Sequence, residues 1–168
     1  MKRQLLVLRH GNAEVGADKD DFDRELTAMG ISQIETVAKW LKSIGNMPDL
    51  ILSSSAERAA ATACRAADIM EIPDSCVVLS KDLYLARSGL LLNALQADTS
   101  DAECLMMVGH NPGLENLVAD LAGLAPYLSA GGGLSTGAIA GIEFDGKWCD
   151  LRQEIADLKF IKGPMNLS

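Results

Sequence analysis

The chain has 168 residues and a formal net charge of −8, with a sequence pI of about 4.7. This length is typical of one domain with a substantial core. The acidic balance argues against nucleic-acid binding, which needs a basic surface. Hydrophobic residues make up 48% of the chain, but no apolar run is long enough to span a bilayer. We therefore expect a globular protein that binds neither nucleic acid nor membrane.

The apolar run near the N-terminus, residues 5–8, is too short for a secretory signal, and Arg9-His10 interrupts it. For this reason we expect a cytoplasmic protein. None of the four cysteines forms a C-x-x-C pair, which favours reduced, buried thiols over disulfides or a zinc site. The two histidines have no further ligand at a suitable spacing, so no metal and no other cofactor is expected.

The first half of the chain predicts two strands and two helices. Residues 5–8 indicate a buried strand that stops at Arg9-His10-Gly11, and an acidic loop follows from Glu14 to Asp23. Residues 26–30 lead into a helix with one apolar face, formed by Ile31, Ile34, Val37, Ala38 and Leu41. A second buried strand, an N-cap and an alanine-rich helix follow at residues 50–52, 53–55 and 56–70.

The second half predicts three further strands, two helices and a hairpin. In chain order we expect a weak strand at 77–79, a helix at 88–97, a strand at 104–108, a helix at 114–124 that begins after Pro112, a flexible connection at 131–133, and a strand at 138–144. A turn at Asp145-Gly146 predicts a hairpin partner from Trp148 onward. The last ~10 residues are expected to form a loose tail.

Strands that alternate with helices predict an α/β fold, with three α/β/α layers around a mostly parallel central sheet. No internal repeat or linker interrupts the pattern, which indicates a single domain over residues 1–168. In open α/β sheets, ligands bind beyond the carboxyl ends of the strands. Three charged segments are expected there: Arg9-His10-Gly11, Arg58 and His110.

Two arginines and two histidines at one edge of a sheet are suited to binding an oxyanion. The planar guanidinium group of arginine matches phosphate oxygens. Helix N-termini after residues 53–55 and after Asn111-Pro112 add backbone donors. A neutral imidazole is a competent nucleophile near neutral pH. These residues therefore predict phosphoryl chemistry.

The charged residues lie within four longer motifs. These are Leu8-Arg9-His10-Gly11, RELTAMG at residues 24–30, SSAERAAATA at residues 54–63, and VGHNP at residues 108–112. In this order they resemble the R-H-G, R-x-L-T-x-x-G, S-x-x-x-R-A-x-x-T-A and second-histidine motifs of the histidine phosphatase superfamily, which includes the phosphoglycerate mutases. The resemblance extends from residue 5 to about residue 144. The short chain and Asn12-Ala13 resemble the SixA-type branch, the bacterial phosphohistidine phosphatases.

The resemblance implies a phosphoglycerate mutase-like fold and a metal-independent mechanism through a phosphohistidine intermediate. It implies that His10 is the nucleophile, and that Arg9, Arg58 and His110 bind the phosphoryl oxygens in the transition state. Further candidates for substrate binding at the rim of the pocket are Gly11, Arg24 and Ser54.

A general acid is harder to identify. Family members that cleave phosphate esters usually carry a Glu after the third strand, and the nearest acid here is Asp82, with Asp23 as another possibility. A weak acid suffices for phosphohistidine, because its leaving imidazole has an unperturbed pKa of about 6.5, far below that of an alkoxide. The missing Glu therefore favours a substrate with an N–P bond.

Structural explanations compete for some of these residues. Arg58 alone is typical of a solvated helix residue paired with Glu57 or Asp68. Arg24 lies among several acidic residues, so a local ion pair competes with substrate contact. Asp82 alone is typical of a loop acid.

Three functions remain open at this point. The first is dephosphorylation of phosphohistidine on a protein, such as a histidine phosphotransfer domain. The second is hydrolysis of a small phosphoester by the same mechanism, and the third is a phosphate-binding module without turnover. The intact His10 counts against the third. A short chain has little length for a lid, which predicts an open site and favours a macromolecular substrate.

Overall fold

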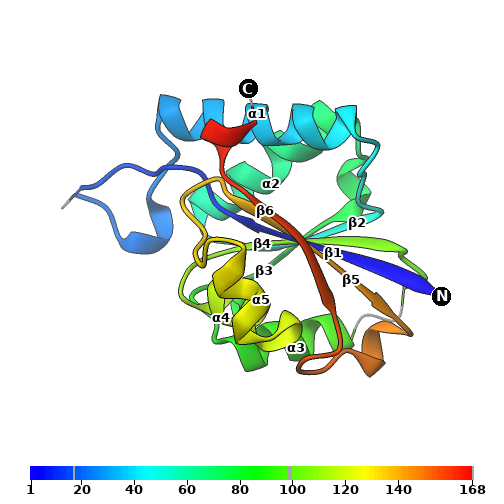
Figure 1. The fold of residues 1–168 in the computed structure, drawn as a ribbon. Helices are drawn as coiled ribbons and strands as arrows, with labels where there is room; N and C mark the ends of the chain where they lie inside the picture. Colours follow the sequence, from blue (N-terminus) through cyan, green and yellow to red (C-terminus); the bar gives the residue numbers. More distant parts are fainter. Residues whose placement is uncertain (17, 98–99, 168) are drawn as a thin grey trace.

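The computed structural model describes residues 1–16, 18–97 and 100–167 and contains a six-stranded mixed sheet with helices on both faces (Figure 1). The strands lie in the order β3-β2-β4-β1-β5-β6. Their bounds are β1 (Lys2–Arg9), β2 (Leu50–Ser54), β3 (Val77–Ser80), β4 (Cys104–Gly109), β5 (Ile139–Asp145) and β6 (Asp157–Lys162).

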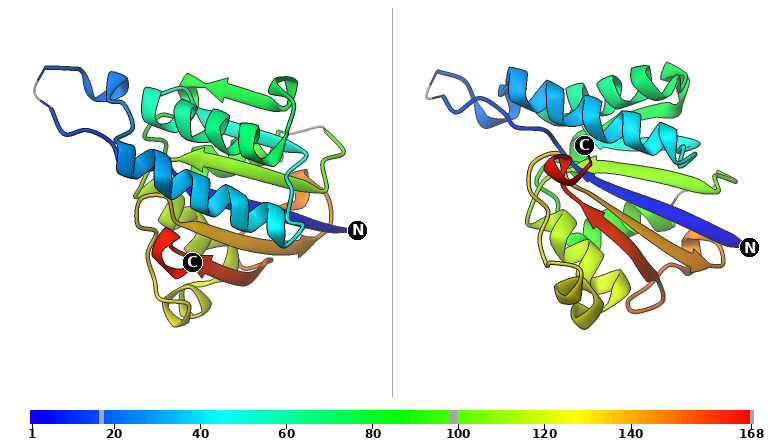
Figure 2. Two further views of the ribbon diagram at one scale, coloured as in Figure 1. Left: turned by 90° about the horizontal axis from the view of Figure 1, so that it is seen from above. Right: turned by 45° about the horizontal axis from the view of Figure 1, so that its top comes forward.

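Two helices, α1 (Ala28–Ser43) and α2 (Glu57–Met70), cover one face of the sheet. The other face carries α3 (Ser88–Gln96), α4 (Gly113–Ala122) and α5 (Leu124–Ser129), as both views of Figure 2 also show. The predicted α/β fold with three layers is therefore confirmed. None of the helices in the described ranges combines the length and apolar character that a membrane span requires.

The central parallel strands of the sheet end at one common edge. Strands β1, β4, β2 and β3 pair in parallel, whereas β5 pairs antiparallel with β1 and β6 antiparallel with β5. Residues 5–8 of β1 are fully buried, and every residue of β4 is buried. Arg9 pairs with Gly109 in the register, so the residues that follow each strand, His10 and His110, leave the sheet side by side.

The inner face of α1 begins one residue earlier than the sequence predicted. Gly30 is buried, and a Cβ atom there would come within 2.1 Å of the carbonyl oxygen of Asn12. Ile31, the next residue around the helix, is exposed. The inward positions are therefore Gly30, Ile34, Val37, Ala38 and Leu41.

The C-terminal third differs from the prediction in three places. The expected helix over residues 114–124 is divided into α4 and α5 at Gly123, whose φ is +89°. The hairpin partner of β5 begins at Asp157, because Trp148 is buried in a 3-10 turn where its indole N–H donates to the Ala102 carbonyl. The last residues are not a loose tail: β6 extends to Lys162.

The expectation of buried thiols is only partly correct. All four cysteines are free, but Cys64 and Cys149 are exposed, Cys76 is half-buried and only Cys104 is buried.

Candidate active site

His10 and His110 lie against each other where β1 and β4 end. Their ring centroids are 5.2 Å apart, and the side chains are 7% and 4% exposed. The backbone N–H of His10 donates to the Gly109 carbonyl at 3.2 Å, which continues the parallel ladder by one residue. The prediction that the two histidines meet at one edge of the sheet is therefore confirmed.

The two nitrogens of His10 face different groups. Nδ1 lies 2.7 Å from the carbonyl oxygen of Gly11, and a carbonyl can only accept, so Nδ1 carries the proton. Nε2 lies 3.4 Å from Nε of Arg58, whose N–H points at it. The neutral ring therefore presents its lone pair on Nε2, toward the arginine. An imidazole held in this tautomer is oriented for nucleophilic attack through Nε2.

Both imidazoles are neutral at physiological pH. Burial, followed by the positive charge of Arg58 and Arg9, lowers the pKa of His10 to about 4, although its bond to Gly11 acts in the opposite direction. Burial and the charge of Arg58 lower the pKa of His110 to about 3. A nucleophilic histidine needs this unprotonated form.

Close backbone packing holds the segment after β1 in place. A Cβ atom on Gly11 would come within 2.7 Å of the Gly30 carbonyl oxygen, so neither glycine of the two motifs tolerates a larger residue without a shift. The Gly11 N–H donates to the hydroxyl of Thr62 at 3.1 Å, and that hydroxyl donates to the Arg58 carbonyl at 2.7 Å. The turn that orients His10 is thereby fixed to α1 and to the start of α2.

Arg58 is a buried site residue rather than a solvated one. Its side chain is 4% exposed, and it lies in the first turns of α2, where the positive end of the helix also favours anions. It contacts neither of the helix acids expected from the sequence. Its terminal nitrogens instead donate to the carbonyl of Asp21 at 2.6 Å and to Asp21 Oδ2 at 3.0 Å.

Asp21 is a residue that the sequence did not single out. It lies in the 3-10 turn η1 (Asp21–Asp23), and its second carboxylate oxygen accepts from Arg24 at 2.9 Å. Arg24 thus forms the local ion pair that competes with substrate contact, and the pair joins Arg24 to Arg58 through one carboxylate. A hydrogen bond from the hydroxyl of Tyr84, followed by those from Arg24 and Arg58, holds the pKa of Asp21 well below its usual range, so the group is ionised. Asp21 is one of several acidic residues in its loop, and no sequence motif distinguishes it from the others.

Tyr84 is the second residue that the sequence missed. Its hydroxyl donates to Oδ2 of Asp21, and its ring packs edge-on against His110, with centroids 5.4 Å apart. The ring also contacts Phe22 of η1 at 5.0 Å. Tyr84 therefore links the acidic turn to the second histidine.

The second histidine is held by β2. Nε2 of His110 lies 2.8 Å from the hydroxyl of Ser54, at the end of that strand. The N-cap predicted at residues 53–55 is wrong: the N-cap of α2 is Ala56, and no side chain caps the helix. The backbone N–H of Ala56 donates to the Ser54 hydroxyl at 3.2 Å. Arg9 donates to the Leu134 carbonyl at 2.9 Å.

Three buried polar atoms have no hydrogen-bond partner in the described part of the chain: Arg9 Nε, His110 Nδ1 and Asn111 Oδ1. Each unpaired buried group costs about 1–3 kcal/mol, and native proteins retain few of them. Arg9 ends β1, and His110 and Asn111 follow β4, so all three lie at this one edge. Their clustering is typical of a site that a polar ligand completes.

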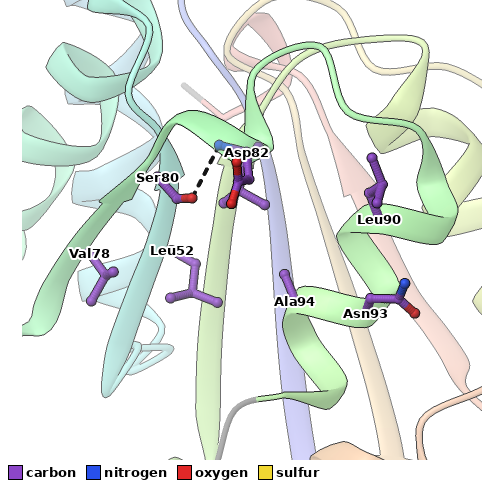
Figure 3. Close-up of a pocket in the computed structure, with 8 residues that line it drawn as sticks. Leu52, Val78, Ser80, Asp82, Leu90, Asn93 and Ala94 are labelled. Atoms are coloured by element: carbon purple, nitrogen blue, oxygen red, sulfur yellow. Dashed lines mark hydrogen bonds between the residues drawn. The ribbon is translucent and has the colours of Figure 1, made fainter.

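The two candidate acids lie outside this cluster. Asp82 lines a cavity of about 510 Å³ between β2, β3 and α3, and its backbone N–H donates to the Ser80 hydroxyl at 3.3 Å. Figure 3 shows its side chain among Leu52, Leu90 and Ala94. Asp23 is exposed at the end of η1. No contact among the described residues joins either carboxylate to His10, Arg58 or His110.

The site is less open than the short chain predicted. His10, His110 and Arg58 are buried, and η1 is held against Arg58 by Asp21. A group of three or more His, Cys, Asp or Glu side chains that could hold a metal ion is not found among the described residues. The charge gathered at the edge comes instead from Arg9, Arg24 and Arg58.

Comparisons with known proteins agree with this arrangement. The family model of the histidine phosphatase superfamily (branch 1) matches residues 5–83. The phosphohistidine phosphatase SixA of Escherichia coli K12 is 31% identical over 144 residues, which cover 84% of this chain and 86% of that protein.

Solved SixA structures resemble this chain over nearly its whole length. A structure of the protein histidine phosphatase SixA complexed with tungstate has a TM-score of 0.82 and 26% identity, and covers 98% of this chain and 99% of its own. A structure from Agrobacterium tumefaciens, described as a candidate phosphohistidine phosphatase SixA, has a TM-score of 0.82 and 26% identity, with 96% and 98% of the two chains covered.

Proposed function

The chain belongs to the histidine phosphatase superfamily and is a hydrolase of that family, and from this premise we propose that it removes the phosphoryl group from phosphohistidine on a protein, with His10 as the nucleophile and no metal ion. The observation that carries the proposal is the environment of His10. Nδ1 is occupied by the Gly11 carbonyl, and Nε2 faces Arg58 beside His110. This is the arrangement that attack on a phosphorus atom requires.

In the first step, Nε2 of His10 attacks phosphorus in line with the N–P bond of the substrate. A new N–P bond forms on His10 and the N–P bond of the substrate breaks. The other nitrogen of the substrate ring has taken a proton from solvent, so the ring leaves as neutral imidazole. The Nδ1–H bond to Gly11 supports the positive charge that the phosphorylated ring acquires. In the second step, water attacks the phosphorus, the bond to Nε2 breaks, and inorganic phosphate leaves.

Arg9 and Arg58 stabilise the charge on the phosphoryl oxygens through both steps. Phosphoryl transfer depends mainly on positioning and on charge stabilisation. His110, which Ser54 holds at 2.8 Å, donates a further hydrogen bond to an oxygen. The cationic side chains take the part that a metal ion plays in other phosphatases, and Arg24 adds charge at the rim.

The chemistry of the leaving group supports phosphohistidine as the substrate. An imidazole leaves with little help, because its unperturbed pKa is about 6.5. An alkoxide needs an acid, and neither Asp82 nor Asp23 contacts the site histidines in the described residues. The relative from Escherichia coli is named for the same substrate class, which makes a phosphorylated histidine phosphotransfer domain the partner to test.

A small phosphoester is the second candidate, and the burial of the site is the observation in its favour. His10 is only 7% exposed, so a small molecule reaches it more readily than a histidine carried by a folded domain. The mechanism at His10 is the same for both substrates.

The test compares wild type with His10→Asn on a phosphotransfer domain that carries phosphohistidine and on p-nitrophenyl phosphate, with EDTA present. We expect phosphate release from the first substrate to survive chelation and to fall by roughly three orders of magnitude or more in the variant. A quenched reaction should contain an acid-labile, alkali-stable phosphoenzyme that His10→Asn cannot form.

The remaining outcomes separate the alternatives. Hydrolysis of p-nitrophenyl phosphate alone would select the small phosphoester. Phosphate binding without turnover of either substrate would indicate a binding module. Turnover that persists in His10→Asn would exclude His10 as the nucleophile, and loss of wild-type turnover on chelation would contradict metal independence.

A further inference from the structure

We propose that Asp21 is an internal counter-anion that pairs with Arg24 and Arg58 and gives them up when an oxyanion binds, so that it sets how tightly the site holds phosphate. The inference rests on the proposed function, because it takes these arginines as the groups that bind the phosphoryl oxygens.

The contacts of Asp21 are those of a bound anion. Oδ1 accepts from Arg24 at 2.9 Å, and Oδ2 accepts from Arg58 at 3.0 Å and from the hydroxyl of Tyr84. The backbone carbonyl of Asp21 also accepts from Arg58 at 2.6 Å. Two arginines and a hydroxyl that converge on one carboxylate form the kind of donor set that binds a phosphoryl group.

A phosphoryl group on His10 would come close to this carboxylate. The same guanidinium contacts both sides, with Nε 3.4 Å from Nε2 of His10 and Nη2 3.0 Å from Oδ2 of Asp21. A phosphoryl group attached to Nε2 therefore shares Arg58 with an ionised carboxylate. Two negative groups that contact the same guanidinium repel each other. The phosphoryl group and the Asp21 carboxylate therefore compete for the arginines.

The turn η1, which carries Asp21, can move at low energetic cost. None of the three residues of η1 is buried, and the side chain of Asp21 is 47% exposed. The turn is attached to the protein body through Asp21 and through the edge contact of Phe22 with Tyr84. Displacement of the carboxylate exposes no core residue, which keeps its cost low.

The competition favours release of the product. When inorganic phosphate leaves, the carboxylate returns to Arg24 and Arg58 and lowers the affinity for a second phosphate ion. The hydroxyl of Tyr84 holds the returned carboxylate in place, because its ring stays against His110. Asp21 is thus an affinity-setting residue and Tyr84 its tether.

The test measures binding of tungstate and of inorganic phosphate by titration calorimetry to wild type, Asp21→Asn, Tyr84→Phe and Asp20→Asn. Asn keeps the shape of the side chain and removes its charge. We expect Asp21→Asn to bind both oxyanions about 5-fold more tightly or better, since a like charge is removed from beside the ligand. Tyr84→Phe should shift the affinity in the same direction by less. Asp20→Asn makes the same charge change at an exposed neighbour in the same loop and should stay within about 2-fold.

Kinetics on p-nitrophenyl phosphate provide a second readout. Asp21→Asn should lower KM and strengthen inhibition by phosphate without raising kcat, which a purely structural role would not produce. Weaker or unchanged oxyanion binding in Asp21→Asn would overturn the proposal and make Asp21 a fixed support for the arginines. If Asp21→Asn does not fold, unchanged or weaker binding by Tyr84→Phe overturns it equally. If wild type binds neither oxyanion, the proposed phosphoryl site fails as well, which distinguishes the two failures.

Discussion

Gly11 and Gly30 meet backbone to backbone: a Cβ atom on Gly11 would come within 2.7 Å of the carbonyl oxygen of Gly30. This contact places the start of α1 directly against the turn that carries His10. It also fixes the Gly11 carbonyl, which accepts from Nδ1 of His10. One close approach therefore supports both a packing contact and the tautomer of His10.

Gly11→Ala should be destabilised by about 1–3 kcal/mol, because backbone atoms cannot move aside for the added methyl group. Activity should fall further than stability, since the Gly11 carbonyl that orients His10 is displaced. Urea unfolding and phosphatase assays on the same preparation check both effects. Gly89→Ala is the matched control: a Cβ atom there meets nothing within 4 Å, and the residue lies in α3. The control should gain about 0.5–1 kcal/mol, and equal behaviour of the two variants would contradict the packing argument.

Ser54→Ala should reduce turnover by about 10-fold with little change in substrate affinity. The change removes the hydroxyl 2.8 Å from Nε2 of His110, so the ring loses the group that orients it toward the phosphoryl oxygens. The control is Ser53→Ala, because Ser53 is equally buried but bonds only to the carbonyl of Ser54. Loss of stability in both variants, with loss of kcat in Ser54→Ala alone, is the expected pattern. Equal kcat in the two would show that Ser54 does not position His110.

Stability should fall as the pH drops from about 6.5 toward 4. The folded protein holds the pKa of His10 at about 4 and that of His110 at about 3, both below the ordinary value of 6.5. Between these values the unfolded chain binds more protons than the folded protein, so the free energy of unfolding decreases with falling pH. Asp21, whose pKa lies below its usual range, adds to the loss at still lower pH. Urea midpoints at about pH 7, 5.5 and 4.5 measure the slope, and His110→Asn should reduce it by about half because one of the two groups is gone. An unchanged slope would mean that His110 is not the buried neutral ring described above.

Asp82→Asn should leave hydrolysis of protein phosphohistidine within about 2-fold of wild type, because the leaving imidazole needs no strong acid. The side chain lines a cavity together with Leu90, and among the described residues it makes no contact with His10 or His110. Full pH–rate profiles on protein phosphohistidine and on p-nitrophenyl phosphate provide the check. Disappearance of the basic limb of the profile in Asp82→Asn would restore Asp82 as the general acid.

The sequence predicted the strand ends well and the loops poorly, for a physical reason. Periodicity and glycine placement are local signals, and they located β1, β4 and the helices that follow. His10 and His110 could be brought together because parallel strands share a carboxyl edge. The confirmed α/β layers follow from the same alternation of strands and helices.

Asp21 and Tyr84 were not predicted because their roles depend on tertiary contacts, which no local sequence pattern indicates. Asp21 is one of several acids in its loop, and its role follows only from a turn that folds back onto Arg58. Tyr84 lies two residues after Asp82 in sequence, yet its ring packs on His110 whereas Asp82 lines a cavity beside α3. The prediction of a loose C-terminal tail was wrong for a similar reason. The ring of Phe160 packs edge-on against that of Trp40, with centroids 5.1 Å apart, and no local sequence pattern indicates this contact.

Strand β1 has both of its edges covered by strands from much later in the chain. Gln4 to Arg9 pair with residues 104–109 on one side, and Lys2 to Leu8 pair with residues 139–145 on the other. During synthesis the ribosome therefore releases His10 long before the strands that pair with β1 exist. A nascent chain that ends before residue 104 contains His10 and Arg58 but has neither His110 nor a partner for β1. His10 is thus translated early but can be placed only after β4 and β5 exist, and a chain that stops before residue 104 lacks part of the proposed site.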